Sequence, residues 1–352
     1  MMKVTLTNEI LSYITEIEHN RYKVSSVKLS KPVMNRLRKN SKKKSSYASN
    51  KIEGNPLSEK QVDEVIERDE RKHYLKPEQE VRNYFLALNY LEEKVSKKEK
   101  FSQKLILDVQ KLVEKGASKE KIGLRGSMPP GVLFAVYDSK TGNPDYIPPE
   151  YCDIPELLDE LVEYVNTTDD HPLIVAAVVH YQLVTIHPFE DGNGRTARLL
   201  SGYIMDLNGY GFNGIGSLEE YFAYDIDEYY ESIQMGLPAL YYSGRENPPH
   251  PEIWINYFLR MVKLYSGKVC DLQLASEEED IAGSLSFLKG KEKELLQFLI
   301  RNYRGEFTPI EVSRELSVSN KTVINRLAVL VKNGFAVPVF ANQRIRSYEL
   351  SE

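Results

Sequence analysis

The sequence predicts a mainly helical protein with a small β-hairpin near its middle and a helix-turn-helix unit with a second hairpin near its end. Three observations support this. Apolar residues recur at helical spacing through the first 115 residues, an apolar run at 173–179 precedes a glycine-containing motif, and short amphipathic segments followed by strand-like residues close the sequence. The composition agrees, because 41% hydrophobic and 28% charged residues are ordinary for a globular protein.

The helical pattern is clearest in seven stretches, of which residues 173–179 suit a buried helix and residues 253–262, around Trp254, a closing core helix. The stretches are 10–17, 61–66, 81–91, 105–113, 173–179, 199–205 and 253–262.

A basic run at 36–44 carries six cations in nine residues. We interpret it as a solvated helix end, with contact to nucleic acid or to an acidic target as the alternative. The acidic residues 277–280 indicate a linker. We expect four parts: a helical region at 1–100, a core at 101–270, a linker at 271–284 and a C-terminal domain at 285–352.

The most informative segment is residues 187–198, His-Pro-Phe-Glu-Asp-Gly-Asn-Gly-Arg-Thr-Ala-Arg. It lies between two helical stretches, so it is predicted to be a loop that opens a helix. Gly192, Asn193 and Gly194 can therefore turn backbone N–H groups toward one point at a helix N-terminus, where they favour a phosphate. Asp191 beside them is typical of a magnesium ligand, since this ion is usually held by one or two carboxylates together with phosphate oxygens.

Three other side chains of the segment suit the same chemistry. Arg195 and Arg198 are three residues apart on one helix face, so both can grip one polyphosphate. His187 gains and loses a proton near neutral pH, which makes it the candidate general base. Each feature alone has a structural explanation. Together they fill every defined position of the pattern His-x-Phe-x-Asp-Gly-Asn-Gly-Arg-x-x-Arg.

On this motif the sequence resembles the Fic family. The resemblance implies a helical enzyme that moves a nucleoside monophosphate, most often AMP from ATP, onto a hydroxyl group of a protein. It implies that His187 deprotonates the target Ser, Thr or Tyr, that Asp191 holds Mg²⁺, and that Arg198 holds the γ-phosphate. The other ATP-binding positions it assigns are Gly192, Asn193, Gly194, Arg195 and Thr196.

A second match lies upstream, in Ser-Asn-Lys-Ile-Glu-Gly-Asn at 49–55. By itself it suits a helix C-terminus closed by glycine, with a proline beyond it. It also fits the family's inhibitory pattern, Ser or Thr, three residues, then Glu followed by Gly or Asn. The resemblance implies an inhibitory helix at about 40–54 with Ser49 and Glu53, in which Glu53 pairs with Arg198 where the γ-phosphate would bind. We then expect an autoinhibited enzyme that modifies itself once Glu53 is removed.

Two further segments follow from the resemblance. Residues 126–137 and 145–149 flank the turn-rich residues 138–144 with strand-like side chains, which predicts a hairpin. In relatives a hairpin here, the flap, docks the target segment by strand addition, although an ordinary packed hairpin is the alternative. Residues 221–233 resemble the segment whose paired tyrosines border the adenosine pocket, and core packing is equally compatible with them. The candidates are Val132, Leu133 and Phe134 for the flap and Tyr229 and Tyr230 for adenosine.

The end of the sequence resembles a winged helix. Amphipathic segments at 307–316 and 319–331 have helix-turn-helix spacing, with Ser319 as N-cap, and strand-like residues follow at 337–340 and 345–350. From residue 281 onward there are eleven Lys and Arg against seven Asp and Glu. This asymmetry is compatible with DNA contact, while winged helices also serve as protein-docking modules or form homodimers. The residues we expect to face DNA are Lys321, Asn325, Arg326, Arg344 and Arg346.

Function is therefore predicted as follows. The first hypothesis is an autoinhibited protein adenylyltransferase that uses ATP and Mg²⁺ and modifies hydroxyl side chains of target proteins and of itself. The second is a DNA-binding regulator whose Fic core senses a nucleotide. The third keeps the enzyme with another donor or with removal of AMP. The intact His187 and Asp191 favour the first hypothesis, and a glutamate aimed at a γ-phosphate favours a nucleoside triphosphate.

Location and cysteine chemistry are predicted from what the sequence lacks. There is no secretory leader pattern and no apolar run long enough to cross a bilayer, so we expect a cytoplasmic protein that does not enter a membrane. Cys152 and Cys270 have no metal-ligand spacing around them, so neither a disulfide framework nor a zinc site is expected.

Overall fold

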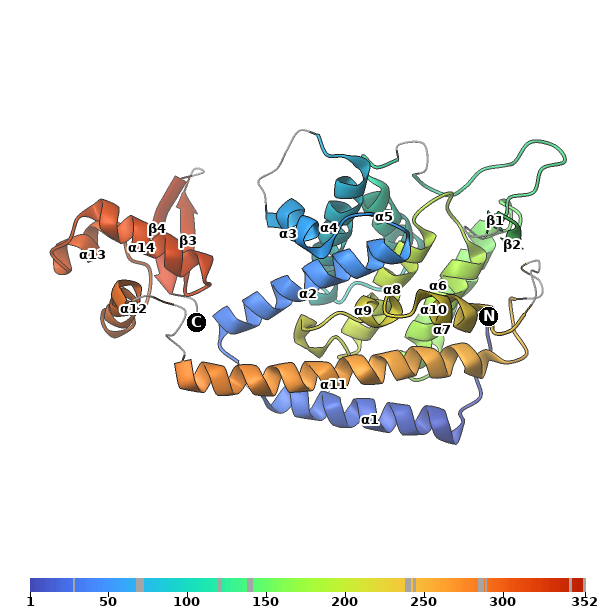
Figure 1. The fold of residues 1–352 in the computed structure, drawn as a ribbon, viewed down its shortest axis with the longest axis horizontal. Coiled ribbons are helices and arrows are strands. Elements are labelled where there is room, and N and C mark those ends of the chain that lie inside the picture. Colours follow the sequence, from blue (N-terminus) through green and yellow to red (C-terminus); the bar gives the residue numbers. More distant parts are fainter. Residues whose placement is uncertain are drawn as a thin grey trace. The chain divides into compact units, whose positions relative to one another are not determined.

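The fold is mainly helical with two small antiparallel hairpins, which confirms the fold class predicted from the sequence (Figure 1). The chain divides into two compact units, the first formed by residues 1–22 and 41–268 and the second by residues 23–40 and 269–352. No helix among the residues described is both long and apolar enough for a transmembrane span. The computed structural model describes residues 1–27, 29–67, 73–118, 122–137, 142–237, 242, 245–283, 288, 290–341 and 344–350.

The first unit holds α3 to α10 and parts of α1, α2 and α11. All seven predicted helical stretches lie within helices of the structure. The bounds are α1 Asn8–Ser26, α2 Lys31–Ile52, α3 Glu59–Glu67, α4 Lys76–Ser96, α5 Gln103–Glu114, α6 Ile154–Thr167, α7 Pro172–Ile186, α8 Asn193–Leu207, α9 Glu219–Phe222, α10 Ile226–Gln234 and α11 Pro251–Gly283, with a 3₁₀ turn at Phe212–Gly214.

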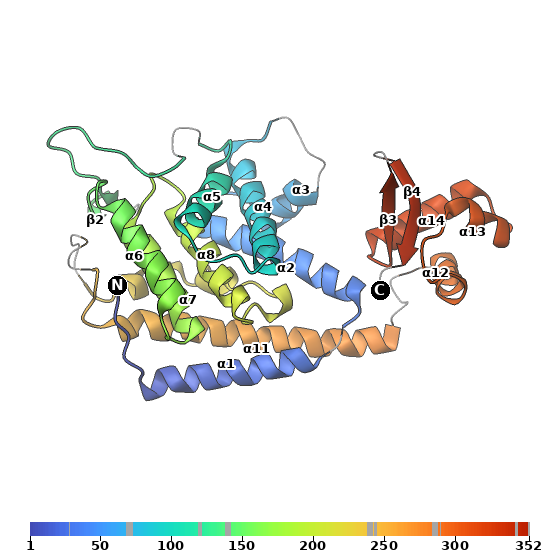
Figure 2. The ribbon, with the colours of Figure 1, turned by 180° about the vertical axis from the view of Figure 1, so that it is seen from behind.

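Helices α7 and α8 form the centre of the first unit. Helix α7 is apolar on all sides, and it is buried along almost its whole length because α6, α8 and α11 cover it. Helices α4 and α5 pack on α8, and Trp254 of α11 donates to the Ala177 carbonyl of α7 over 2.8 Å. Helix α1 lies beside α11 (Figures 1 and 2), where Asn256 donates to Glu9 over 2.8 Å. This packing fixes the loop between α7 and α8.

Helix α2 packs on the first unit with a polar inner face. Its buried residues include Ser45, Ser46, Ser49 and Asn50, each less than 9% exposed. The basic run at 36–44, interpreted from the sequence as a solvated helix end, behaves differently in its last three residues. Their ammonium groups pair with carboxylates of the first unit: Lys42 with Glu92 at 2.5 Å, Lys43 with Glu67 at 2.8 Å and Lys44 with Glu220 at 3.0 Å.

The predicted hairpin forms, but its first strand lies later than expected. Strand β1, Val136–Tyr137, pairs with β2, Pro144–Tyr146, and the residues at 138–141 lie outside those described. The flap candidates Val132, Leu133 and Phe134 precede β1, so assigning them to a strand was wrong. Two prolines at 129 and 130 offer no N–H group to a ladder, and the Val132 N–H closes a turn onto the Pro129 carbonyl over 3.0 Å.

The second unit contains the predicted helix-turn-helix and hairpin. Ser319 caps α14, since its Oγ accepts from the Thr322 N–H over 3.1 Å. The bounds are α12 Gly290–Asn302, α13 Pro309–Glu315, α14 Asn320–Lys332, β3 Ala336–Ala341 and β4 Arg344–Leu350. The core is made of Leu288, Leu295, Leu296, Leu299, Phe307, Val312, Val323, Leu327, Leu330, Ala336 and Tyr348.

The predicted linker at 271–284 is helical in the part described. Helix α11 continues to Gly283, and the division between the two units falls within it at Val269. Ala, Leu, Gln and Glu in this stretch are all favourable in helices, which accounts for its helical conformation.

Candidate active site

The loop between α7 and α8 holds the motif in a tight turn. His187 ends α7 in a left-handed conformation with φ 49°, and Gly192 precedes α8 with φ 81°. Asn193 closes the loop through both ends of its amide: Oδ1 accepts from the Phe189 N–H over 3.0 Å, and Nδ2 donates to the Phe189 carbonyl over 2.9 Å. The side chain of Asn193 thus shapes the loop, which leaves its backbone N–H for an anion.

His187 has the protonation state that a general base needs. Its Nδ1 lies 3.2 Å from the Val184 carbonyl. Because a carbonyl only accepts, Nδ1 carries the proton and Nε2 is left with a lone pair. Burial, together with the nearby Arg125 guanidinium, lowers the pKa of His187 to about 4, so the ring is neutral at physiological pH.

A carboxylate stands over the first turn of α8. A Cβ atom on Gly194 would lie 2.5 Å from Glu53 Oε1, so only a glycine leaves room for that oxygen. This is the place where the helix N-terminus was predicted to bind a phosphate. In the structure an anionic group, supplied by α2, is therefore already at the predicted phosphate position.

Arg198 holds that carboxylate. Its guanidinium side chain is 1% exposed and donates from NH2 to Glu53 Oε1 over 2.6 Å. It also donates to Ser49, from Nε to Oγ over 2.8 Å and from NH2 to the carbonyl over 3.0 Å. Burial is the largest single influence and lowers the pKa of Arg198, but Glu53, Tyr229 and Tyr84 together outweigh it and raise the pKa above its usual value. The predicted contact between Glu53 and Arg198, 145 positions apart, is present.

Arg195 points elsewhere, although both arginines were expected to grip one polyphosphate. Its NH2 lies 2.9 Å from Glu114 and 3.2 Å from Asp191, and NH1 lies 4.0 Å from Glu80. Glu114 is fully buried, and burial raises its pKa to about 7 while Arg195 lowers it. Arg195 and Arg198 thus contact carboxylates of different helices.

Asp191 suits the predicted magnesium ligand. Its side chain is 29% exposed, and its Oδ1 accepts from the Gly192 N–H over 2.8 Å as well as from Arg195. Within the described ranges, no three His, Cys, Asp or Glu side chains are grouped as a metal site. One carboxylate fits Mg²⁺ nevertheless, because this ion completes its shell with phosphate oxygens and water.

The paired tyrosines have different environments. Tyr229 is 1% exposed within an aromatic cluster, and its hydroxyl contacts His180 at 2.8 Å and Arg198 at 3.4 Å. Tyr230 is 43% exposed, with its ring 5.1 Å from that of Tyr229. Thr196 is fully buried inside α8. Core packing therefore describes Tyr229, whereas Tyr230 is open to a ligand.

Three side chains that contact the motif or α2 had no assignment from the sequence: Glu114, Arg125 and Glu219. Arg125 donates from Nε to the His187 carbonyl over 2.8 Å. Glu219 accepts from Ser45 and Tyr84, each over 2.8 Å, and so fixes the middle of α2. For Glu114 a signal existed, since it falls four positions after Gln110 on the buried face of α5.

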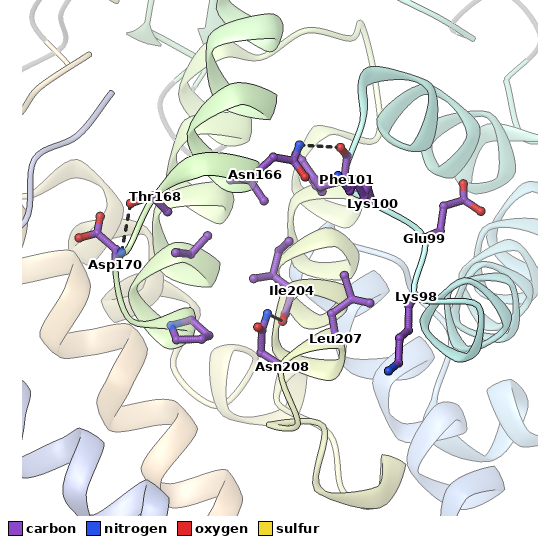
Figure 3. Close-up of a pocket in the computed structure, with 13 residues that line it drawn as sticks. Lys98, Glu99, Lys100, Phe101, Asn166, Thr168, Asp170, Ile204, Leu207 and Asn208 are labelled. Atoms are coloured by element: carbon purple, nitrogen blue, oxygen red, sulfur yellow. Dashed lines mark hydrogen bonds between the residues drawn. The ribbon is translucent and has the colours of Figure 1, made fainter.

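Cavities away from the motif are not part of this site. One of about 230 Å³ lies at the opposite end of α8, lined by Ile204, Leu207 and Asn208 (Figure 3). At 1.5 Å per residue, that end is roughly 20 Å from the motif. Lys98, Lys100 and Asp170 also line this cavity (Figure 3).

Comparison with known proteins places this arrangement in a family. The Fic/DOC family profile matches residues 57–205, a range that includes α3 and α4. The chain is 46% identical over 67 residues to the protein adenylyltransferase fic-1 of Caenorhabditis elegans, covering 18% of this chain and 13% of that one. It is 27% identical over 206 residues to the protein adenylyltransferase Fic of Drosophila grimshawi, covering 56% and 40%.

Solved structures agree on the fold. A Fic family protein from Desulfovibrio desulfuricans has a TM-score of 0.65 at 20% identity, covering 100% of this chain and 98% of that one. The C. elegans Fic-1 structure has a TM-score of 0.59 at 24% identity, covering 77% and 73%. The chain spans less than half the length of the two curated relatives named above. The profile match places a Fic domain at residues 57–205, and the motif with its loop geometry lies within that range.

Proposed function

We propose that this chain is an autoinhibited protein adenylyltransferase that moves AMP from ATP to hydroxyl side chains. The observation that carries the proposal is the contact of Glu53 with Arg198 over the first turn of α8, beside a neutral His187. The curated relatives named protein adenylyltransferase support the reaction class. The inhibitory helix is then the second half of α2.

In the proposed reaction, the chain's own residues accept one proton and hold the phosphates in place. His187 Nε2 accepts the proton of a Ser, Thr or Tyr hydroxyl as its oxygen bonds to the α-phosphorus, and the bond to pyrophosphate breaks. Backbone N–H groups at the N-terminus of α8 hold phosphate oxygens in line. Mg²⁺, held by Asp191 and phosphate oxygens, would neutralise charge on the leaving pyrophosphate.

Inhibition follows from competition between two anions. Arg198 is almost completely buried, so its charge must be matched, and Glu53 matches it in the resting chain. A γ-phosphate needs the same guanidinium. ATP therefore binds with its phosphates displaced, or only after Glu53 leaves. Without Glu53, Arg198 is available to the γ-phosphate and the α-phosphorus can align with the hydroxyl.

Helix α2 is suited to such a release because polar contacts hold it. Ser45 donates to Glu219, and three lysines form ion pairs that are partly exposed. Partly exposed pairs contribute on the order of 0–1 kcal/mol each, since water replaces them readily. A modest input from a partner can therefore change the position of α2.

The proposed contacts with substrates involve side chains that are exposed. Tyr230, rather than the buried Tyr229, is the proposed adenosine contact. The hairpin of β1 and β2 is the proposed docking place for a target strand, with Val132 and Leu133 exposed before it. Self-modification is expected when Glu53 is lost.

For the second unit we propose a winged helix that contacts DNA, as a function additional to transfer. In its support, Lys321 and Asn325 are exposed on α14 and Arg346 is exposed on β4. Binding should weaken steeply with salt if phosphates are contacted. If Lys321 contacts a phosphate, Lys321→Ala should weaken binding and make the slope of log K against log salt shallower by about one, with folding unchanged; an unchanged slope would count against the assignment.

Labelled ATP tests the proposed reaction. The chain, its Glu53→Gly variant and the Glu53→Gly, His187→Ala double variant are each incubated with Mg²⁺ and ATP labelled on the α- or the γ-phosphate. We expect protein labelling only in the single variant and only from the α-position. Label from the γ-position would instead mean phosphoryl transfer. Glu190→Gln, which alters an exposed carboxylate of the same loop, should behave as the parent does.

A further inference from the structure

Arg125 is a buried cation that contacts the backbone of the candidate base, His187. It is 5% exposed, and its Nε donates to the His187 carbonyl over 2.8 Å. Its backbone N–H donates to the Pro188 carbonyl over 2.9 Å. The His187 carbonyl belongs to a residue with positive φ, so it points away from α7 and needs a donor from elsewhere. Arg125 supplies that donor.

The same guanidinium contacts both flanks of the hairpin. Its NH2 donates to the carbonyl of Pro149, which follows β2. Its carbon lies 4.7 Å from the ring centre of Phe134, which precedes β1. The Phe134 ring in turn lies 5.9 Å from the His187 ring. The Arg125 guanidinium thus contacts Phe134 before the hairpin, Pro149 after it and the backbone of His187.

We propose that Arg125 is a positioning residue that aligns His187 with a target strand held on the hairpin. This inference rests on the proposed function. Two parallel N–H donors on one rigid plane fix two carbonyls relative to each other, which a lysine ammonium on a flexible stem does not do. Because misplacement of reacting groups by about 1 Å can cost on the order of 100-fold in rate, the alignment matters for transfer.

Arg125 also sets the electrostatic environment of the base. The charged groups that face His187 are Arg125, which lowers its pKa, and Glu53 and Asp191, which raise it. Removing the cation should therefore move the pKa of His187 upward. A lysine in its place keeps the charge and should leave the pKa nearer its parent value, while losing the bridge. The two substitutions separate charge from geometry.

Arg245 provides a matched control. It is 3% exposed, and its guanidinium lies 4.5 Å from the ring centre of Tyr146, on β2 of the same hairpin. Its NH2 lies 3.5 Å from the Asp145 carbonyl. Arg245 is thus a second buried arginine that packs against the same hairpin, through Tyr146 and Asp145. A general loss of hairpin packing should affect both arginines alike.

The experiment compares Arg125→Lys, Arg125→Gln, Arg245→Lys and Arg245→Gln. In the Glu53→Gly background, the rate of self-modification is measured against ATP concentration and pH. In the parent background without nucleotide, the titration of His187 is followed by NMR, its resonance identified among the six histidines by its absence in His187→Ala. The NMR measurement does not depend on transfer, so failure of the proposed function and failure of this inference are distinguishable.

We expect both Arg125 variants to lower the rate at saturating ATP at least about tenfold, with the KM for ATP within about twofold of the parent, since Arg125 does not contact the phosphate site. The pKa of His187 should rise in Arg125→Gln while staying below its ordinary value, because burial remains the main cause that lowers it, and it should stay unchanged in Arg245→Gln. An unchanged His187 titration in Arg125→Gln would overturn the proposal. Equal rate losses in the Arg245 variants would do so too, because they would assign Arg125 a purely structural role.

Discussion

Replacing Glu53 by glutamine should destabilise the resting chain by about 1–2 kcal/mol. Loss of a hydrogen bond to a charged group costs about 1.5–3 kcal/mol, and breaking a fully buried ion pair costs about 3–5 kcal/mol. We expect a loss at the low end of the hydrogen-bond range, because the Glu53 side chain is 34% exposed and because Arg198 keeps both contacts to Ser49. In a unit of this size the loss corresponds to roughly 2–8 °C in Tm.

ATP should reverse this loss in the variant, whereas it should stabilise the parent no more than ADP does. A ligand at one hundred times its Kd adds about 2.7 kcal/mol to the stability of the state that binds it. ATP offers Arg198 a γ-phosphate in place of the missing carboxylate. ADP lacks that phosphate and so serves as the matched ligand, since it should stabilise parent and variant to a similar extent.

The assay is thermal unfolding of the parent, Glu53→Gln and Glu190→Gln, each alone and with Mg²⁺ and ATP or ADP. We expect the difference between ATP and ADP to be large in Glu53→Gln and small in the other two proteins. Glu190 is exposed on the same loop, so its variant controls for a general change in charge. Equal stabilisation of all three proteins by ATP would refute the reasoning, because Glu53 would then not compete with the γ-phosphate.

Three further predictions follow from the same geometry. The folded pKa of His187 is about 4, below its usual value, so the base is neutral above that pH. Glu53→Gly also lacks the carboxylate that raises this pKa, so its rate should fall only at or below about pH 4, and a fall near 6.5 in a pH–rate profile would contradict this. The pKa of Glu114 is raised to about 7 in the folded chain. Between about pH 4.5 and pH 7 the folded chain therefore binds more protons than the unfolded chain, and its stability falls as pH rises through that window. Glu114→Gln should remove up to about 3 kcal/mol of this dependence in urea titrations at pH 5 and 8, and an unchanged dependence would be evidence against it. Gly192→Ala should lower the free energy of unfolding by at least about 1–2 kcal/mol, because φ is 81° and the new Cβ would lie 2.7 Å from Glu114 Oε1; a neutral effect would mean that the loop relaxes freely.

The sequence predicted the helices and the motif loop well. Helical periodicity depends on local spacing, so the seven stretches and the cap at Ser319 were accessible from the residues alone. The contact of Glu53 with Arg198 was accessible only through the family resemblance, since no local pattern joins positions 145 residues apart. It is the part of the predicted site that the structure supports most directly.

The parts that were missed depend on three-dimensional context. Whether Val132 and Leu133 pair in a strand depends on a partner strand, and two preceding prolines delay the pairing to Val136. Arg125 sits in a short segment without periodicity, so nothing local indicates that it reaches the His187 carbonyl. The acidic stretch after Ser276 lies in a helix that its polar character did not indicate, because these residues also have high helix propensity.

Intact-mass measurement of the Glu53→Gly variant after incubation with ATP and Mg²⁺, followed by fragmentation, tests the central claim most directly. The account predicts that the variant gains the mass of AMP on a Ser, Thr or Tyr hydroxyl, while the parent and the Glu53→Gly, His187→Ala double variant stay largely unmodified. Equal modification of the double variant, or a gain of phosphate alone, would contradict the account.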